Sequence, residues 1–332
     1  MEMAMRIWAT IVLMVLSVLI GEYVLGSMSI AMLPGLPFLM LWYGAGAVLI
    51  RETVRRTSRG WPALILFAIA FALIEEGLLT QSLFNPDYLG MRLLDFGYIP
   101  ALGTSLSWAF LVLGLHIFWS IGLSIGLAEL AFRKERAVPW LGRIGTSVIT
   151  VLLLLGAVFI AGVTYYQRPF IAHPGQIATV VLLSAAAITA GLAWPRPGSP
   201  TLGAAPKSIV LAAVSFVFGS AFLGVKYFGV PFTGPNATLQ TGLAAAIAIS
   251  AWALMYRLTY RRLWTDRHRF AFAAGGYGVY VWLGFYNSQG LHGPGDLLGH
   301  AILTGVVTLG ILWLGWKIWR SDASAVVTQA QS

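Results

Sequence analysis

Residues 67–86 read FAIAFALIEEGLLTQSLFNP and place two adjacent carboxylates, Glu75 and Glu76, in a run apolar enough to lie in a bilayer. An ionisable side chain at membrane depth costs about 2.5–3.5 kcal/mol on insertion scales, so such residues usually face a protein interior or a water-filled cavity and mark functional sites. Two neighbouring carboxylates cannot easily both be ionised, which strengthens this expectation. The stretch therefore predicts a transmembrane helix that carries a polar site.

The composition of the whole chain is that of a polytopic membrane protein. Its 332 residues are 58% hydrophobic and only 10% charged, with a mean hydropathy of +0.80, whereas soluble domains carry roughly 25% charged residues. A bilayer core of about 30 Å requires apolar runs of about 17–25 residues. Ten such runs lie at 7–25, 36–50, 61–81, 105–131, 144–164, 176–194, 208–225, 238–256, 270–286 and 297–316. The sequence thus predicts an all-α bundle of about ten transmembrane helices.

The basic residues fix the expected orientation of this bundle. Of the 21 Lys and Arg residues, 18 fall in loops on one side and at both chain ends, and three fall on the other side. The positive-inside bias then places both termini in the cytoplasm, and the basic loops face anionic headgroups. We therefore expect the net charge of +9 to serve membrane topology, with the lipid bilayer of the plasma membrane as partner and no nucleic acid.

The chain divides into a single transmembrane domain over residues 1–320 and a polar cytoplasmic tail over residues 321–332, which we expect to be disordered. It contains no cysteine. Disulfides, thiolate nucleophiles and Cys-ligated metal sites are therefore excluded.

Two histidines lie at depths from which they could meet the glutamate pair. With a rise of about 1.5 Å per residue, Glu75 lies about 21 Å above the cytoplasmic start of its helix, and His116 and His300 lie about 16 Å and 5 Å below the outer surface. The candidate site residues are accordingly Glu75, Glu76, His116 and His300, sharing one cavity open to the outside. The apolar connection 82–104 is expected to fold back over that face, beside the glutamates.

Both histidines lie in stripes of polar residues at every fourth position, and a stripe of this kind is also typical of helix–helix hydrogen bonding. The stripes are His116, Ser120 and Ser124, and Asp296, His300, Thr304 and Thr308.

The other acidic residues have simpler expected roles. Glu75 and Glu76 project about 100° apart on an α-helix, so we expect one to face the cavity and the other to bond a neighbour. Glu22 is expected to reach the interface, with the glutamate cluster as the alternative. Glu52 and Glu129, at cytoplasmic helix ends near arginines, are interpreted as surface ion pairs.

An intramembrane Glu-Glu pair followed by one His on each of two later helices resembles the CAAX protease and bacteriocin-processing family of glutamate intramembrane proteases. In that family the pair is followed, after three residues, by Arg, where this chain has Thr80. The family's second motif places Phe four residues before a His, where Val112 precedes His116. The run EEGLLTQSLFNP is also similar to uncharacterised bacterial multipass membrane proteins.

A third motif of the protease family pairs a His with a polar residue four positions on, often Asn, where this chain pairs His300 with Thr304. The resemblance implies a peptidase in which one glutamate activates water and His116 and His300 stabilise the oxyanion or hold the water.

Two further hypotheses stay open beside the peptidase. The same polar groups would suit a proton- or cation-coupled transporter of a small solute, and a non-catalytic scaffold or immunity-type protein would use them only structurally. No cofactor is required. A divalent metal held by Glu75, His116 and His300 would fit a two-histidine, one-carboxylate set.

Overall fold

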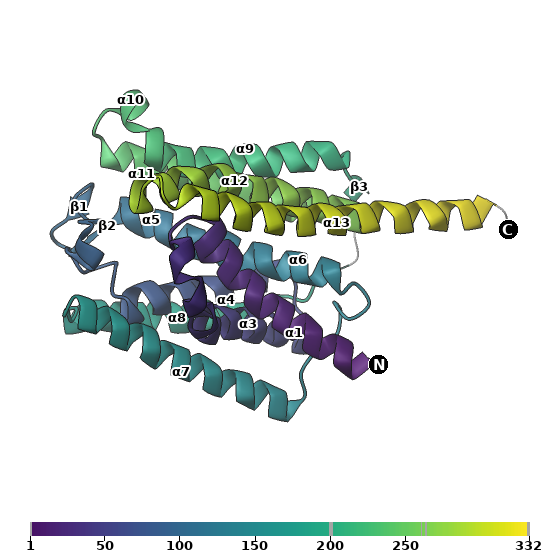
Figure 1. Ribbon diagram of the computed structural model, residues 1–332, viewed down its shortest axis with the longest axis horizontal. Coiled ribbons are helices and arrows are strands. Elements are labelled where there is room, and N and C mark those ends of the chain that lie inside the picture. Colours follow the sequence, from purple (N-terminus) through teal and green to yellow (C-terminus); the bar gives the residue numbers. More distant parts are fainter. Residues whose placement is uncertain (1, 199–201, 260, 263, 331–332) are drawn as a thin grey trace.

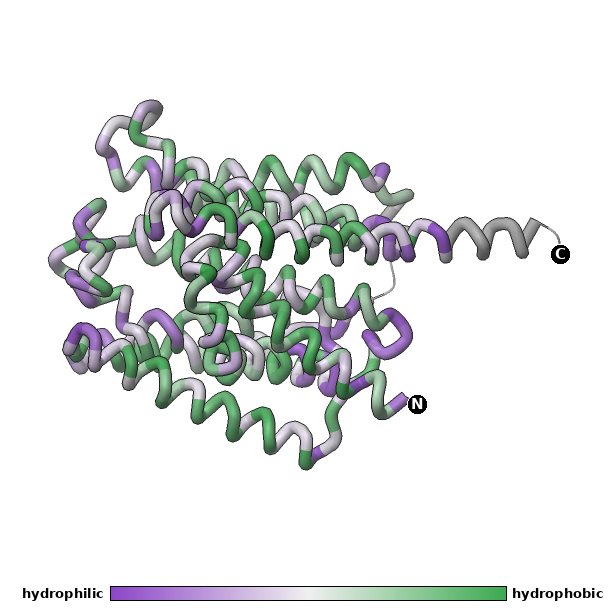
Figure 2. The backbone as a smooth tube through the Cα atoms, in the orientation of Figure 1, coloured by the Kyte–Doolittle hydropathy of each residue, from purple (hydrophilic) through white to green (hydrophobic). Residues whose placement is uncertain are grey.

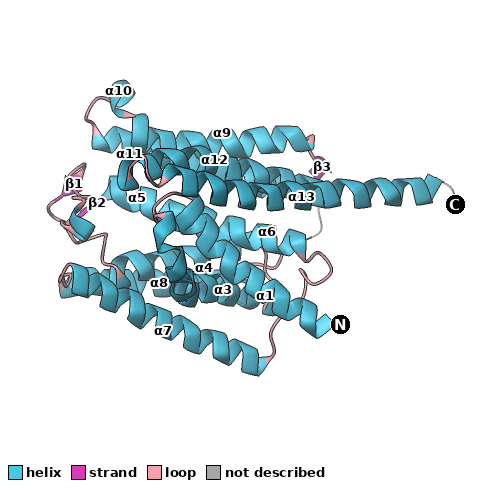
Figure 3. Cartoon of the chain, viewed as in Figure 1, coloured by secondary structure: helices cyan, strands magenta, loops and turns pink. Residues whose placement is uncertain are grey.

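A computed structural model describes residues 2–198, 202–259, 261–262 and 264–330 of the chain (Figure 1). Helices account for almost all of this part, with only short strands between them, as Figure 3 shows. In the first half the elements are α1 (Glu2–Val18), η1 (Leu19–Val24), η2 (Ile30–Gly35), α2 (Leu36–Leu39), η3 (Met40–Gly44), α3 (Ala45–Arg56), α4 (Trp61–Ile74), η4 (Glu75–Leu79), η5 (Tyr88–Gly90), β1 (Tyr98–Ile99), β2 (Thr104–Ser105), α5 (Leu106–Gly114), η6 (Leu115–Leu123), α6 (Ser124–Ala131) and α7 (Arg143–Gln167). In the second half they are α8 (Pro174–Ala193), β3 (Leu202–Ala204), α9 (Ser208–Phe228), α10 (Val230–Thr233), α11 (Ala237–Thr259), β4 (Arg261–Arg262), α12 (Asp266–His292) and α13 (Leu297–Ala330).

The predicted all-α membrane bundle is confirmed. Nine helical spans in the described part of the chain are long and apolar enough to cross a bilayer. The remaining predicted span, 270–286, lies in α12, whose 27 residues are long enough to cross a bilayer but include more polar side chains. Figure 2 shows apolar residues along the middle of the helices and polar residues gathered at the two ends of the bundle.

Both ends of the chain lie at the same end of the bundle (Figure 1), as an even number of crossings requires. We call this end, which carries Arg6 and the loops after α3 and α6, the basic end. Helix α13 continues to Ala330, well into the segment predicted as a disordered tail, and residues 331–332 lie outside the described part.

The buried side chains form two large clusters that meet at the first helix. One cluster joins α1, η3 and α4 through residues such as Leu13, Trp42 and Phe71. The other joins η1, η6 and the C-terminal helices through residues such as Trp119 and Tyr280, whose rings stack with centroids 4.9 Å apart. The N-terminal part and the C-terminal part of the chain are therefore packed around a shared centre, formed by η1 and η6.

Local sequence signals account for the ends of several elements. Helix α4 begins with Pro62 in its first turn, where a missing N–H costs nothing. Helix α5 begins after Ser105, whose side chain accepts a hydrogen bond from Trp108 N at 3.2 Å. Strands β1 and β2 pair antiparallel in the connection before α5, and β3 pairs parallel with β4 at the basic end.

Candidate functional site

Four helices change from α to π geometry around one point inside the bundle. The π-helical segments η3 and η6 lie within helical spans, and the π-helical segments η1 and η4 end theirs. In η4, for example, Thr80 N donates to Glu75 O at 2.8 Å, five residues back. Such segments are rare and occur frequently at functional sites, because the wider turn changes which side chains face inward.

Each of these segments contributes polar side chains to the same place. Segment η4 supplies Glu75 and Glu76, η6 supplies His116 and Ser120, and η3 supplies Tyr43. All five side chains are buried, with Glu75 only 2% exposed and His116 6% exposed. The structure thus confirms that the glutamate pair is buried and brings His116 to it.

The imidazole of His116 lies between the two glutamates. Its Nε2 is 2.8 Å from Glu76 Oε1, and its Nδ1 is 3.5 Å from Glu75 Oε2. Glu76 Oε2 also accepts hydrogen bonds from Thr80 Oγ1 at 3.2 Å and from Ser82 Oγ. Glu76 is therefore held by its neighbours, as expected for one member of the pair, while Glu75 Oε2 has no hydrogen-bond partner among the described residues.

Several buried polar atoms at this point lack a hydrogen-bond partner among the described residues. They are Glu75 Oε2, His116 Nδ1, Ser120 Oγ and Trp42 Nε1. Buried polar groups are almost always paired, so each exception needs an explanation such as a bound water or ion. Two of these exceptions, Glu75 Oε2 and His116 Nδ1, lie 3.5 Å apart and together indicate a place for a small ligand.

A second layer of polar groups surrounds His116. The Tyr43 ring stacks on the imidazole at 5.7 Å between centroids, and Tyr43 is close enough to Glu22 and Glu75 to interact with both carboxyl groups. Glu22 also accepts a hydrogen bond from Ser27 Oγ at 2.6 Å and is close enough to His116 to interact with its charge. Glu22 therefore belongs to the cluster, which the sequence offered only as the alternative to an interfacial position.

The connection between η4 and α5 covers the site. The chain turns at Gln81, whose φ of 53° is in the left-handed region, and this turn brings Ser82 back onto Glu76. Trp108 Nε1 then donates to Ser82 Oγ at 3.2 Å, and Thr104 Oγ1 donates to Leu83 O at 2.5 Å. The predicted fold-back of the segment 82–104 beside the glutamates is confirmed.

His300 contacts a different set of residues. It lies in the first turn of α13, where its ring is 4.9 Å from the Phe285 ring and its Nε2 is 3.4 Å from Thr304 Oγ1. That turn packs on η1 and η2, so His300 meets the backbone of Tyr23 rather than a glutamate. The structure therefore brings three of the four candidate residues together and leaves His300 in a helix-packing contact.

The same three residues have the donor chemistry of a metal site. One ligand atom each from Glu75, Glu76 and His116 lies within 4.8 Å of the other two, and all three residues are buried. Carboxylate and imidazole donors suit several divalent metals. A divalent metal, if bound, would thus use Glu76 in place of the predicted His300.

A model described as an uncharacterized membrane protein family matches residues 11–270, which is more than three quarters of the 332 residues. The chain belongs to that family. No curated protein and no solved structure matches the chain. Membership in this family supports the similarity to uncharacterised multipass membrane proteins and gives no support to the resemblance to glutamate intramembrane proteases.

The family match covers the whole of the cluster described above. Glu22, Tyr43, Glu75, Glu76 and His116 all lie within residues 11–270. The matched part ends within α12, before α13 begins, so it does not include His300.

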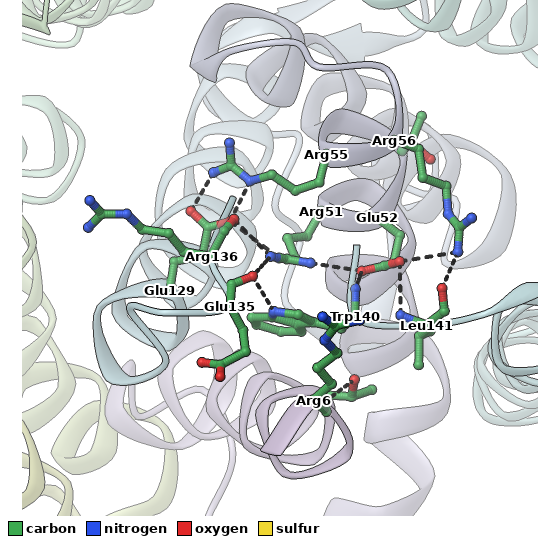
Figure 4. A network of polar contacts seen from close by, with 12 residues as sticks. Arg6, Arg51, Glu52, Arg55, Arg56, Glu129, Glu135, Arg136, Trp140 and Leu141 are labelled. Carbon is green, nitrogen blue, oxygen red and sulfur yellow. Dashed lines mark hydrogen bonds and ion pairs between the residues drawn. The ribbon is translucent and has the colours of Figure 1, made fainter. Parts of the chain in front are cut away.

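A second polar network, drawn in Figure 4, corrects the expectation of surface ion pairs. Arg51 is 0% exposed, Glu52 1% and Glu129 5%. Arg51 donates to Glu52 at 2.8 Å and to Glu129 at 3.2 Å, and its guanidinium stacks on Trp140 at 3.6 Å. The expected ion pairs are present, but their expected surface position was wrong because the loop after α6 folds back over α3 and covers the charges.

Proposed function

We propose that the protein is a membrane-embedded hydrolase in which Glu75 activates a water molecule beside His116. One observation carries this proposal: Glu75 Oε2 and His116 Nδ1 are buried, lie 3.5 Å apart, and have no hydrogen-bond partner. A buried water needs two to four polar partners, and these two atoms supply the minimum number.

Glu76 acts as a positioning residue in this proposal. Its carboxylate accepts a hydrogen bond from His116 Nε2–H at 2.8 Å, which fixes the orientation of the ring and leaves Nδ1 facing Glu75. The arrangement follows the general pattern in which a catalytic base or acid is oriented by a third group. Thr80 and Ser82 hold Glu76 in turn.

The proposed step transfers one proton from water to Glu75 while the water oxygen attacks a carbonyl carbon. His116, protonated on both nitrogens, keeps its Nδ1 proton and donates a hydrogen bond from it to the oxyanion that forms. When the carbon–nitrogen bond breaks, the proton on Glu75 passes to the leaving amine, so the enzyme returns to its first state. The resemblance noted in the sequence implies a peptide bond of a membrane-associated substrate.

The test compares new protein termini in membranes from cells that express the wild type or a Glu75→Gln variant. Labelled water, H₂¹⁸O, marks hydrolysis because the new carboxyl group takes up one solvent oxygen. Removal of a general base lowers the rate by roughly 10²–10⁴-fold, so the labelled termini should disappear with Glu75→Gln and with His116→Ala.

A matched control uses the histidine that the structure leaves outside the site. His300→Ala should retain the labelled termini, while a thermal melt of each purified variant shows that it is folded. Full retention of cleavage by folded Glu75→Gln would exclude the proposed base. Loss with His300→Ala to the same extent as with His116→Ala would also contradict the assignment.

A second candidate function is cation- or proton-coupled transport, favoured by the three mutually close ligand atoms of Glu75, Glu76 and His116. Acidic side chains and histidines buried in transmembrane helices often bind the coupling ion. This candidate predicts ion-dependent solute uptake into proteoliposomes, lost in Glu75→Gln, with no labelled termini. If folded variants change stability alone, with neither cleavage nor flux in the wild type, the cluster is structural and the chain is a scaffold.

A further inference from the structure

A cavity of about 520 Å³ lies beside the candidate site and is separate from it. It is bounded by α4, η6 and α6 on one side and by α9, α11 and α12 on the other. Its volume falls within the roughly 300–1,000 Å³ typical of ligand pockets. Its lining includes Phe118 and Trp119 but neither the glutamate pair nor His116, so the proposed hydrolysis does not account for it.

The cavity lies where two consecutive helices, α8 and α9, pack on different neighbours. Helix α8 packs on α4, while the next helix, α9, packs on α12 and α11. Figure 1 shows α8 and α9 on opposite sides of the bundle, with α6 and α12 between them. The space is therefore enclosed by helices that belong to the two different parts of the bundle.

Arginines dominate the part of the lining at the basic end. Arg55, Arg59, Arg136 and Arg269 line the cavity there, together with one carboxylate, Glu129. The lining therefore carries an excess of positive charge within a largely apolar protein.

The neighbouring carboxylates do not neutralise this excess. Glu129 is shared by Arg51 and Arg55, and Asp266 is shared by three arginines. Those three are Arg133, Arg136 and Arg269. Glu52 also pairs with Arg51 and Arg56, so among the described residues three carboxylates serve six guanidinium groups.

The side chain of Arg59 is half-buried and lacks a partner among the residues that the structure describes. No ion pair joins its guanidinium to a carboxylate, and its Nε is buried without a hydrogen bond. A buried N–H donor without an acceptor is costly, and an anion beside this guanidinium would supply the acceptor. Arg59 therefore points to a bound anion at this end of the cavity.

The remaining wall of the cavity is hydrocarbon and aromatic. Phe118, Phe222, Ile247 and Phe272 line it, and Trp61 lies near Arg59 at its basic end. Arginines at one end and apolar walls along the rest match a ligand with an anionic head and a hydrocarbon chain. A small soluble anion would match the arginines but would leave the apolar walls without a partner.

We propose that this cavity binds one membrane lipid with an anionic phosphate headgroup, which contacts Arg59 while an acyl chain occupies the apolar wall. The headgroup lies at the membrane end where lipid phosphates are found, which follows from the position of the basic loops. Guanidinium groups bind phosphate oxygens through paired hydrogen bonds. The four lining arginines supply such donors, and binding of the headgroup at Arg59 leaves the ion pairs of the other three in place.

The test measures lipids retained by the purified full-length chain, using native mass spectrometry after mixing with phosphatidylglycerol or with phosphatidylcholine of the same chains. The wild type should retain phosphatidylglycerol in preference to phosphatidylcholine. Arg59→Gln should weaken this binding about tenfold, the loss expected for one charge-assisted hydrogen bond. The matched control, Arg143→Gln, changes an exposed arginine outside the cavity lining and should bind as the wild type does.

A second variant tests the apolar part independently of charge. Ala248→Phe places a ring into the cavity wall and should reduce lipid retention without altering the arginines. Glycerol phosphate serves as a soluble headgroup, and competition by it at equal concentration would show that no acyl chain is recognised. Equal losses for Arg59→Gln and Arg143→Gln, or undiminished retention by folded Ala248→Phe, would overturn the proposal.

Discussion

Replacing Arg51 by Met should destabilise the protein more than any other single change at the basic end. The Arg51 side chain is fully buried and donates four hydrogen bonds. Two go to the carboxylates of Glu52 and Glu129, and two go to the carbonyls of Glu135 and Arg136 at 3.1 and 2.9 Å. Removing one partner of a buried ion pair costs about 3–5 kcal/mol, because the other charge is left uncompensated.

The remaining contacts place the cost near the lower end of that range. Glu129 keeps its two hydrogen bonds from Arg55. Glu52 keeps the backbone N–H groups of Trp140 at 2.7 Å and Leu141 at 3.2 Å. Neither carboxylate is then wholly unpaired, so we expect a loss of about 3 kcal/mol. At about 2 °C per kcal/mol for a chain of this size, Tm should fall by about 6 °C.

The assay is a thermal melt in detergent together with limited trypsin digestion. Since Arg51 binds the loop after α6 to α3, its loss should speed cleavage at the basic residues of that loop, such as Arg133 and Lys134. Arg143→Met, at an exposed position at the start of α7, provides the control and should leave Tm within about 1 °C. A shift of less than 2 °C with unchanged cleavage would show that the network does not hold the loop.

Three further changes test other contacts of the structure. Gly21→Ala should destabilise the protein by about 1–3 kcal/mol, because a Cβ at this position would lie 2.7 Å from the Ser120 side-chain oxygen. A thermal melt measures this loss, and Gly162→Ala, where nothing lies within 4 Å of an added Cβ, is the control. His300→Ala should lower Tm while sparing any cleavage or flux that the glutamate variants abolish. In the connection between α12 and α13, burial would raise the pKa of Asp296, but its hydrogen bonds from two serines and one backbone N–H lower it below its ordinary value. The Tm advantage of wild type over Asp296→Asn should therefore hold above about pH 5 and disappear as pH falls through the lowered pKa, and a pH-independent difference would contradict this.

Hydropathy was sufficient to predict the bundle, because each span must satisfy its backbone inside the bilayer and therefore forms a helix. The same argument located the polar site, since a glutamate pair inside a span has few stable environments other than a buried polar cluster. The positions of Glu75, Glu76 and His116 followed from this reasoning and from the depth of each residue. The enzymatic role of the cluster stays a prediction.

The details that were missed share a physical cause. The depth estimates and the fourfold stripes assumed α-helical geometry, whereas the site lies in π-helical segments. Tyr43 was not selected because an aromatic residue in a span resembles ordinary core, and nothing in the sequence places it against His116. The burial of Glu52 depends on a loop that folds back from a distant part of the chain, which local patterns cannot indicate.

The two buried polar networks differ in a way that bears on function. Around Arg51, the charges are matched with donors and acceptors in close contact (Figure 4), and the network closes a loop onto a helix. Around His116, polar atoms of Glu75, Ser120 and His116 itself have no hydrogen-bond partner. The adjacent Glu76, by contrast, is hydrogen-bonded by the hydroxyl groups of Thr80 and Ser82. Stability alone favours full pairing, so a site that only held helices together would resemble the first network. The unpaired atoms between Glu75 and His116 are therefore better explained as the binding place of a water, proton or cation, which both proposed activities require and a purely structural cluster does not.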